Sequence, residues 1–404
     1  MSENPTTTKT ISRAVPRGLA RTGPVLFSYG FRPFFLGAAL HAIVAMALWI
    51  AALFLGLAVG GDYGASHWHA HEMLFGFAPA VLAGFLLTAV PNWTGRLPVS
   101  GRPLIALFAL WVAGRLALLY PDPIGIVPAA VIDGAFLPAL LVICAREIIA
   151  GRKWKDLKMV GALTALSLAN GCFHVETILG EHAGYAARLA IGAYVTLIMI
   201  VGGRIIPSFC RNWLNQRGVS SFPVPYNRFD TVAILAGAGA LACWIGAPDQ
   251  PLTAVAALAA AGLQTIRLSR WRGMSVVAEP LLFVLHIAYG FIPLGFLSIA
   301  LGAFELMNAT SVLHVLTVGV VASMMLAVMT RATRGHTGRA LSASIMTTCS
   351  YCALFLAALL RPLGEVFPDY AMTLYAAAGI AWMLAFLLFS LEYGPMLAIT
   401  RRAL

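Results

Sequence analysis

Twelve stretches of 18 to 26 mostly apolar residues occupy almost the whole chain. A helix needs about 20 apolar residues to cross a hydrocarbon core of about 30 Å, so each stretch is long enough to span a bilayer. The chain is 60% hydrophobic and only 11% charged, which is too little polar surface for a soluble protein of 404 residues. We therefore predict an all-α, polytopic membrane protein with twelve transmembrane helices. The expected spans are 34–59, 68–90, 103–120, 124–146, 157–179, 184–207, 229–246, 250–268, 279–301, 308–330, 340–360 and 369–393.

Charged residues divide unequally between the connections that join these spans. The two tails and the connections after even-numbered spans hold most of the Lys and Arg, whereas the other connections hold mainly Asp and Glu. The positive-inside rule then places both termini in the cytoplasm. We expect a cytoplasmic N-terminal tail at 1–33, a transmembrane bundle at 34–393 and a cytoplasmic C-terminal tail at 394–404. The net charge of +11 reflects this orientation, and nucleic-acid binding is not expected.

The inner ends of spans 2, 6 and 10 resemble one another in their Gly, Arg and Pro content, at 91–96, 202–207 and 330–339. These spans are four helices apart and run in the same direction, as three four-helix repeats related by rotation would require. The alternative is that Gly and Arg are simply common where helices leave the membrane on its positive side. Both interpretations stay open.

Histidines alternate at the start of the second span, at His67, His69 and His71, and Glu72 follows them. Residues two apart on a helix point in nearly opposite directions, whereas residues four apart share a face. His67 and His71 are therefore expected to face one way, and His69, with Glu72 near it, the other. Neutral imidazoles suit haem iron, copper and zinc, and a carboxylate can orient a ligating imidazole. Span 2 could serve two sites at once.

Four histidines are expected at a similar depth near the outer surface, because 1.5 Å of rise per residue places His69, His71, His174 and His314 in one layer. An ionisable side chain inside a membrane is a functional hypothesis by default. A neutral imidazole can instead bridge two helices by hydrogen bonds.

Several longer motifs resemble the NnrS family of haem- and copper-containing membrane proteins. The most distinctive of these motifs contains Trp68-His69-Ala70-His71-Glu72. The motifs are distributed along nearly the full chain, at 31–35, 68–76, 87–96, 202–207, 285–289 and 314 with 331–339. The resemblance implies a twelve-helix protein of the bacterial inner membrane with bound haem, which we expect to be of b type, and copper. It also implies a role in handling nitric oxide or relieving nitrosative stress, as in denitrifying bacteria, with an electron donor that the sequence does not identify.

We expect haem between spans 2 and 10, with His69 or His71 on one axial side and His314 on the other. This arrangement is similar to the haem-copper oxidases, which also use twelve helices and place haem ligands on helices 2 and 10. Those enzymes build a copper site from histidines on helices 6 and 7, and neither predicted span holds a histidine here. Copper or a second haem would need the other face of span 2 together with His174, His67 or His182.

Arg115, Arg188 and Arg361 are the basic residues that depart from the positive-inside pattern. Arg115 and Arg188 could pair with haem propionates. They could equally form structural ion pairs with Asp133 and Glu176.

His286 and Tyr289 share a face of span 9, and His41 lies at a similar depth on span 1. They could form a second metal site in the inner leaflet or a proton path. Packing with internal hydrogen bonds is the alternative.

Two functions are compatible with this pattern. The first is a haem-dependent redox protein that binds nitric oxide or reduces it, as a nitric oxide oxidoreductase would. The second is a transporter or sensor of copper, haem or a nitrogen-oxide species. Discontinuous helices would favour transport, and Pro79, Pro207 and Pro293 could interrupt spans 2, 6 and 9.

Overall fold

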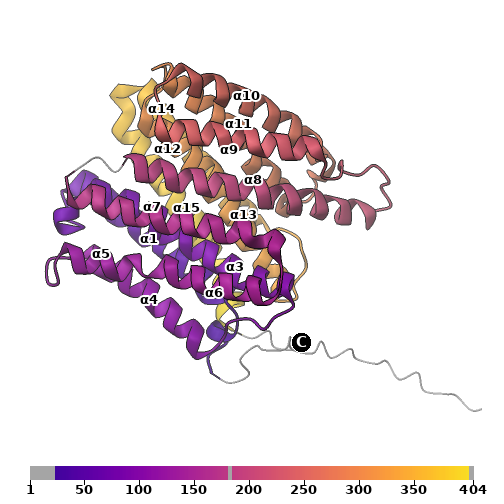
Figure 1. Ribbon diagram of the computed structural model, residues 1–404, viewed down its shortest axis with the longest axis horizontal. Coiled ribbons are helices and arrows are strands. Elements are labelled where there is room, and N and C mark those ends of the chain that lie inside the picture. The colour runs from indigo at the N-terminus through magenta and orange to yellow at the C-terminus, as the bar shows by residue number, and fades with distance from the viewer. Residues whose placement is uncertain (1–22, 181–183, 400–404) are drawn as a thin grey trace, which may run out of the picture.

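The structure is a computed structural model that describes residues 23–180 and 184–399, and all regular elements in these two ranges are helical. In chain order the helices are η1 Val25–Ser28, α1 Phe31–Leu55, η2 Gly61–Tyr63, α2 Ala65–His71, η3 Glu72–Phe77, α3 Ala78–Thr94, α4 Arg102–Leu119, α5 Ile126–Gly134, α6 Phe136–Ala150, η4 Trp154–Asp156, α7 Leu157–Ile178, α8 Gly184–Asn215, α9 Arg228–Gly246, α10 Pro251–Ser269, η5 Gly273–Val276, α11 Pro280–Ala303, α12 Ala309–His314, η6 Val315–Ala322, α13 Ser323–His336, α14 Ile345–Val366, η7 Pro368–Tyr370 and α15 Ala371–Ala398. Figure 1 shows most helices running roughly side by side, with α4–α7 on one side of the bundle and α9–α11 on the other.

Eleven helical segments among the described residues are long and apolar enough to cross a membrane. They correspond to eleven of the twelve predicted stretches, so the protein is a multi-pass, all-α membrane protein. The remaining stretch, 157–179, forms α7, which is long enough but more polar than the others. Asn170 and His174 lie on its buried face and lower its hydropathy. A twelfth crossing through α7 stays a prediction.

Several predicted boundaries differ from the structure. Helices α13, α14 and α15 end at His336, Val366 and Ala398, five or six residues beyond the predicted ends, and α15 thus continues into the predicted C-terminal tail. Helix α8 continues through Pro207 to Asn215, eight residues beyond the predicted end, and thereby shortens the predicted inward connection. At the other end, η1 and the start of α1 lie within the predicted N-terminal tail, and the Phe27 ring packs on Phe108 at 5.8 Å between ring centroids. Apolar side chains at these positions favour packing over exposure to solvent.

Four segments form the centre of the bundle. In the most apolar 18-residue window of 65–94, 89% of residues are buried, and the corresponding share is 61% for 184–215 and 67% for both 280–303 and 309–336. The other seven segments have 22% to 39%, because much of their surface faces outward. The second predicted span, which carries the histidine motif, is therefore the most enclosed of the eleven.

Two of these central segments contain a π-helical stretch directly after their histidines. Segment η3 follows His71, and η6 follows His314. Stretches of π-helix are rare and frequently occur at functional sites, because they change the direction in which side chains point. Helix α8, the sixth predicted span, is described as α-helix throughout. Spans 2 and 10 thus share a feature that span 6 lacks, and the threefold repeat stays a prediction.

The π-stretch in η3 leaves backbone carbonyls that other helices satisfy. A π-helical hydrogen bond joins a carbonyl to the N–H five residues later, and the residue five after Leu74 is Pro79, which has no N–H. The Tyr194 hydroxyl of α8 donates to the Leu74 carbonyl at 3.0 Å. The Trp111 indole N–H of α4 donates to the Gly76 carbonyl at 2.9 Å. These two contacts anchor the histidine-bearing segment between α4 and α8.

Candidate metal and cofactor sites

The two faces of α2 lead to two different sites. His71 is fully buried and points toward α5 and α7, where Asp133 and His174 lie. His69 lines a cavity that also contains His314 of α12. His69 and His71 therefore face opposite ways, as expected. The expected place of Glu72 near His69 is wrong, because Glu72 Oε1 lies 3.4 Å from His71 Nδ1 and accepts from Arg115. We call the first site the polar cluster, comprising His71, Glu72, Arg115, Asp133, Asn170 and His174, and the second the His69–His314 cavity.

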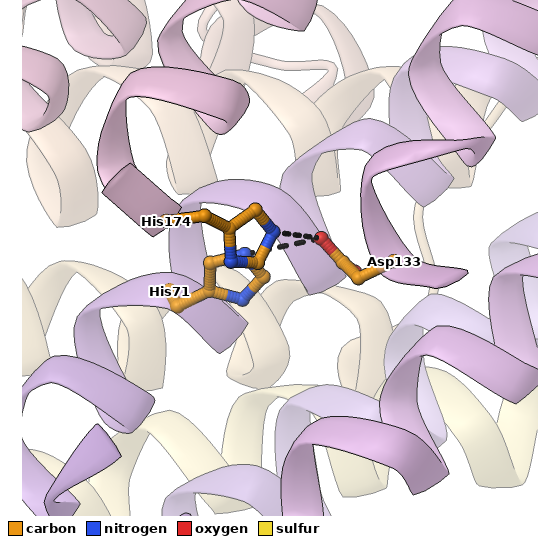
Figure 2. Close-up of side chains that lie close together, drawn as sticks. All are labelled: His71, Asp133 and His174. Atoms are coloured by element: carbon orange, nitrogen blue, oxygen red, sulfur yellow. Dashed lines mark hydrogen bonds and ion pairs between the residues drawn. The ribbon is translucent and has the colours of Figure 1, made fainter. Parts of the chain in front are cut away.

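Three donor atoms converge at the heart of the polar cluster. Asp133 Oδ2 lies 3.2 Å from His71 Nε2 and 3.0 Å from His174 Nε2, and all three atoms lie within 4.8 Å of one another. Figure 2 shows both imidazole rings turned toward the same carboxylate oxygen. A tetrahedral metal with bonds of about 2.0–2.2 Å separates neighbouring ligand atoms by a little more than 3 Å, so a small movement would accommodate an ion.

Further side chains hold these ligand candidates in place. Glu72 Oε1 lies 3.4 Å from His71 Nδ1, the ring nitrogen that faces away from Asp133. Asn170 Oδ1 lies 2.9 Å from His71 Nε2, and the Asn170 amide donates to Asp133 Oδ2 at 2.9 Å. The Tyr63 hydroxyl, from η2 in the connection between α1 and α2, lies 2.8 Å from His174 Nδ1. Hydrogen-bonded supports of this kind fix the tautomer and the ring orientation of ligating histidines.

Charge in the polar cluster favours a cation. Arg115 donates to Glu72 Oε1 at 2.8 Å and forms an ion pair with Asp133. One guanidinium thus faces two buried carboxylates, which leaves one negative charge if the imidazoles are neutral. His41 Nε2 lies 2.9 Å from Glu72 Oε2, although the two groups lack hydrogen-bond geometry. Because an uncompensated buried charge is costly, this charge is offset by a proton on one of the imidazoles or carboxylates or by a bound metal ion.

Two local features bring Asp133 and Arg115 together. Asp133 is the penultimate residue of α5, just before the chain changes direction into α6. Helix α4 approaches α5 closely at Gly114, where an added Cβ would lie 3.0 Å from the Asp133 Cα. This close approach allows the neighbouring Arg115 to reach the carboxylate.

The His69–His314 cavity has a volume of about 260 Å³ and lies between α1, α2, α8, α12, α14 and α15. His69 stacks on Trp49, with ring centroids 4.6 Å apart and planes 12° apart. His314 Nδ1 donates to the Thr310 carbonyl at 2.7 Å, which leaves the lone pair on Nε2. Most of the remaining lining is apolar, including Met46, Met73, Phe77, Leu313 and Trp382.

Polar atoms without partners point to a ligand in this cavity. His69 Nδ1 and Arg361 Nη1 are buried and have no hydrogen-bond partner. The Arg361 guanidinium lies over the Tyr375 ring, 3.9 Å from its centroid. Two imidazoles, one guanidinium and an apolar surround are the groups that a haem requires for its iron, its propionates and its macrocycle. The residues present therefore fit haem.

The structure distributes the predicted site residues unevenly. His69 joins His314, and His71 joins His174 and Glu72. His67 is half-buried on α2 but makes none of the contacts described above for the polar cluster, and His182 lies outside the described residues. His286 lies elsewhere, with Cys210 Sγ 3.6 Å from its Nε2.

The arginines and the inner-leaflet group also have defined partners. Arg115 forms the ion pair with Asp133 that was one of the two alternatives. Arg188 donates to the Ile245 carbonyl at 3.3 Å and is not among the residues that line the cavity. Tyr289 contacts Arg267 and Gln264 rather than His41, which lies against Glu72. The group proposed from His41, His286 and Tyr289 is thus distributed over separate sites.

Several residues that complete the two sites were not predicted as ligands or cofactor contacts. Asp133 was expected only as a possible ion-pair partner of Arg115, Arg361 only as an exception among the basic residues, and Tyr63, Asn170 and Trp49 were not predicted at all. Asp133 and Asn170 are polar residues inside apolar stretches, and Arg361 departs from the positive-inside pattern. Each was therefore detectable as an exception within a membrane span.

The residues of both sites lie within a region of the chain that matches one known protein family. The family model described as NnrS protein matches residues 25–401, which include every helix from η1 to α15. The chain belongs to the NnrS family. Membership indicates a membrane protein related to nitric oxide. No curated protein sequence matches the chain. Both sites of this NnrS protein lie on helices that the family match covers.

Proposed function

We propose that this NnrS protein binds haem in the His69–His314 cavity and handles nitric oxide there, in the inner membrane of a bacterium. The main evidence is that two imidazoles, His69 and His314, come from helices more than 200 residues apart and line one largely apolar cavity. The buried, unpartnered atoms of His69 and Arg361 support it, since both would gain partners from the cofactor. When bound, haem would supply an iron that takes up nitric oxide and an electron that activates it.

The two histidines have different roles in this proposal. His314 is the permanent ligand, because the hydrogen bond from its Nδ1 to Thr310 holds the ring and leaves Nε2 free to bind a metal. The His69 ring is held chiefly by stacking on Trp49. His69 can therefore move aside for a gas molecule more easily than His314. Arg361 pairs with a propionate.

The polar cluster supplies a second function. We assign to His71, Asp133 and His174 the binding of copper, for which two imidazoles and a carboxylate are suitable ligands. When no metal is bound, the hydrogen-bonded path from Tyr63 through His174 and Asp133 to His71 can instead carry protons inward from the outer connection. Reduction of nitric oxide consumes protons, so the cluster suits a reductase as well as a binding protein.

The proposed orientation places both sites near the periplasmic face and both termini in the cytoplasm. Its support is the concentration of basic residues at the opposite ends of the same helices, including Arg96 after α3 and Arg331 and Arg334 in α13.

Transport is less well supported than redox chemistry. Pro207 and Pro293, which could have interrupted spans 6 and 9, lie inside the continuous helices α8 and α11. Pro79 follows the π-stretch at the start of α3, and the chain remains helical there. These helices therefore do not offer the unwound backbone that many transporters use to bind their cargo.

An absorption spectrum of the purified protein tests the haem assignment. We expect a Soret band that shifts when nitric oxide is added to the reduced protein, and its loss in His314→Ala, which removes the permanent ligand. His69→Ala should change the band and lower haem content less than His314→Ala does. His71→Ala is the matched control and should keep the band, because His71 contacts the polar cluster instead of the cavity. If His314→Ala retains an unaltered haem spectrum, the proposed site is wrong.

A further inference from the structure

A second and smaller cavity lies between α3, α8 and α13, with a volume of about 70 Å³. Its lining is almost entirely apolar and includes Val81, Phe85, Val201, Met324 and Val328. A cavity needs about 10–15 Å³ to hold one water-sized molecule, so there is room for a small ligand.

This cavity is unsuitable for water. A buried water needs two to four polar partners, and the one lining side chain with a hydroxyl is Tyr194. That hydroxyl already donates to the Leu74 carbonyl. The chemistry of the lining therefore selects a small ligand that makes no hydrogen bonds.

The lining residues of the small cavity lie about one helical turn from those of the His69–His314 cavity along the same three helical segments. In the second predicted span, Ala78 lines the larger cavity and Val81 and Leu82 line the smaller one. The same step occurs in α8 from Ile191 to Tyr194. It occurs again from Ala322 of η6 to Met325 of α13. A separation of three or four residues is one helical turn, or about 5.4 Å.

A hydrogen bond between Tyr194 and Leu74 joins the linings of the two spaces. The Tyr194 side chain lines the smaller cavity, and Leu74 lines the larger one. The hydrogen bond between them depends on the carbonyl that Pro79 leaves without a helical partner. The irregular backbone beside the histidines thus provides a hydrogen bond that joins residues of both linings.

We propose that the smaller cavity is a holding site for an apolar diatomic gas that enters from the lipid and passes along the α3–α8–α13 seam to the larger cavity. The apolar lining and the volume of the cavity are the evidence that it binds an apolar gas. The identity of the gas as nitric oxide and the destination at a haem rest on the proposed function.

Xenon tests the site, because it is apolar, compact and readily located by its electron density. Crystals of the full-length protein under xenon pressure should show an atom among Val81, Tyr194 and Val201. Val201→Phe fills the cavity and should abolish this atom. Val232→Phe is the matched control, since Val232 is 54% exposed on α9, and should leave the atom in place.

A kinetic measurement tests the route. In the haem-loaded protein, Val201→Phe should slow nitric oxide association roughly tenfold, which corresponds to about 1.4 kcal/mol of added barrier. The haem spectrum of this variant should not change. Val232→Phe should associate with nitric oxide at the wild-type rate. Absence of xenon from the wild-type cavity, or a lipid chain that occupies it, would overturn the holding site. Xenon in the cavity together with an unchanged association rate would overturn its role as a route. Purified protein without haem would contradict the proposed function, and the xenon result would still decide the cavity.

Discussion

His69 and His71 are two residues apart on one helix, and their imidazoles lie in different surroundings. His71 is enclosed by hydrogen-bonding groups, with Asn170 at 2.9 Å and Asp133 at 3.2 Å from its Nε2. His69 instead has an aromatic neighbour and a ring nitrogen without a partner. The imidazole of His71 therefore lies among charged and polar groups, whereas that of His69 lies in an apolar cavity. We expect different ligands at the two positions.

Removal of His174 tests metal binding by the polar cluster. Wild-type protein should bind one copper ion there and gain about 2.7 kcal/mol of stability at a hundredfold excess over the dissociation constant. His174→Ala should lose both the ion and the gain, because it deletes one ligand and leaves the Arg115–Asp133 pair intact. Metal analysis and thermal unfolding, each with and without a chelator, measure the two effects.

His286→Ala is the control for this experiment, since His286 is a buried histidine whose described partners are Cys210 and the Leu282 carbonyl. It should bind as much copper as the wild type. Equal copper content in His174→Ala and wild type would count against the assignment of the cluster as a metal site.

At the scale of the elements, the π-stretches position the site residues. The Leu74 carbonyl in η3 has no partner within the helix, because Pro79 lacks an N–H. The Tyr194 hydroxyl donates a hydrogen bond to it instead. A buried carbonyl without a partner costs about 1–3 kcal/mol. The helix can therefore keep its irregular geometry only because α8 supplies a hydroxyl at the correct height.

Tyr194→Phe should lower the free energy of unfolding by about 1–3 kcal/mol, since it leaves the Leu74 carbonyl unpaired. In a Pro79→Ala background the loss should be smaller, because residue 79 then offers an N–H to that carbonyl. A double-mutant cycle from denaturant unfolding measures the coupling. Tyr370→Phe serves as the control at a residue that is 66% exposed. Strictly additive effects of the two changes would contradict the coupling.

At the scale of the whole molecule, α7 decides the topology. The other eleven segments are apolar enough to cross by themselves, whereas α7 contributes Asn170 and His174 to the polar cluster. Its polar face is accommodated because α5 and α8 cover it. A crossing by α7 makes the number of spans even and keeps both termini on the same side.

Cysteine labelling tests this crossing in a variant that lacks the six native cysteines. Lys155→Cys and Leu179→Cys lie at exposed positions on either side of α7. A membrane-impermeant thiol reagent should label position 179 in intact cells and position 155 only after permeabilisation. Equal labelling of both positions in intact cells would show that α7 does not cross, and would place the two termini on opposite sides.

The amino-acid sequence by itself determined the membrane class, the limits of most helices and the opposite orientation of His69 and His71. These properties depend on hydrophobic length and helical period, which are local and can be counted along the chain. The NnrS motifs were also local, and the family match confirmed them.

Only the tertiary structure decided which imidazole meets which partner. The rotation of each helix about its axis depends on packing against neighbours that are distant in sequence, so the pairs of His69 with His314 and of His71 with His174 could not be chosen beforehand. The same holds for Asp133, which a break between two short helices aims at the polar cluster. It holds as well for Arg361, which reaches the cavity from α14. Local sequence sets which groups each helix carries, and long-range packing sets where those groups converge.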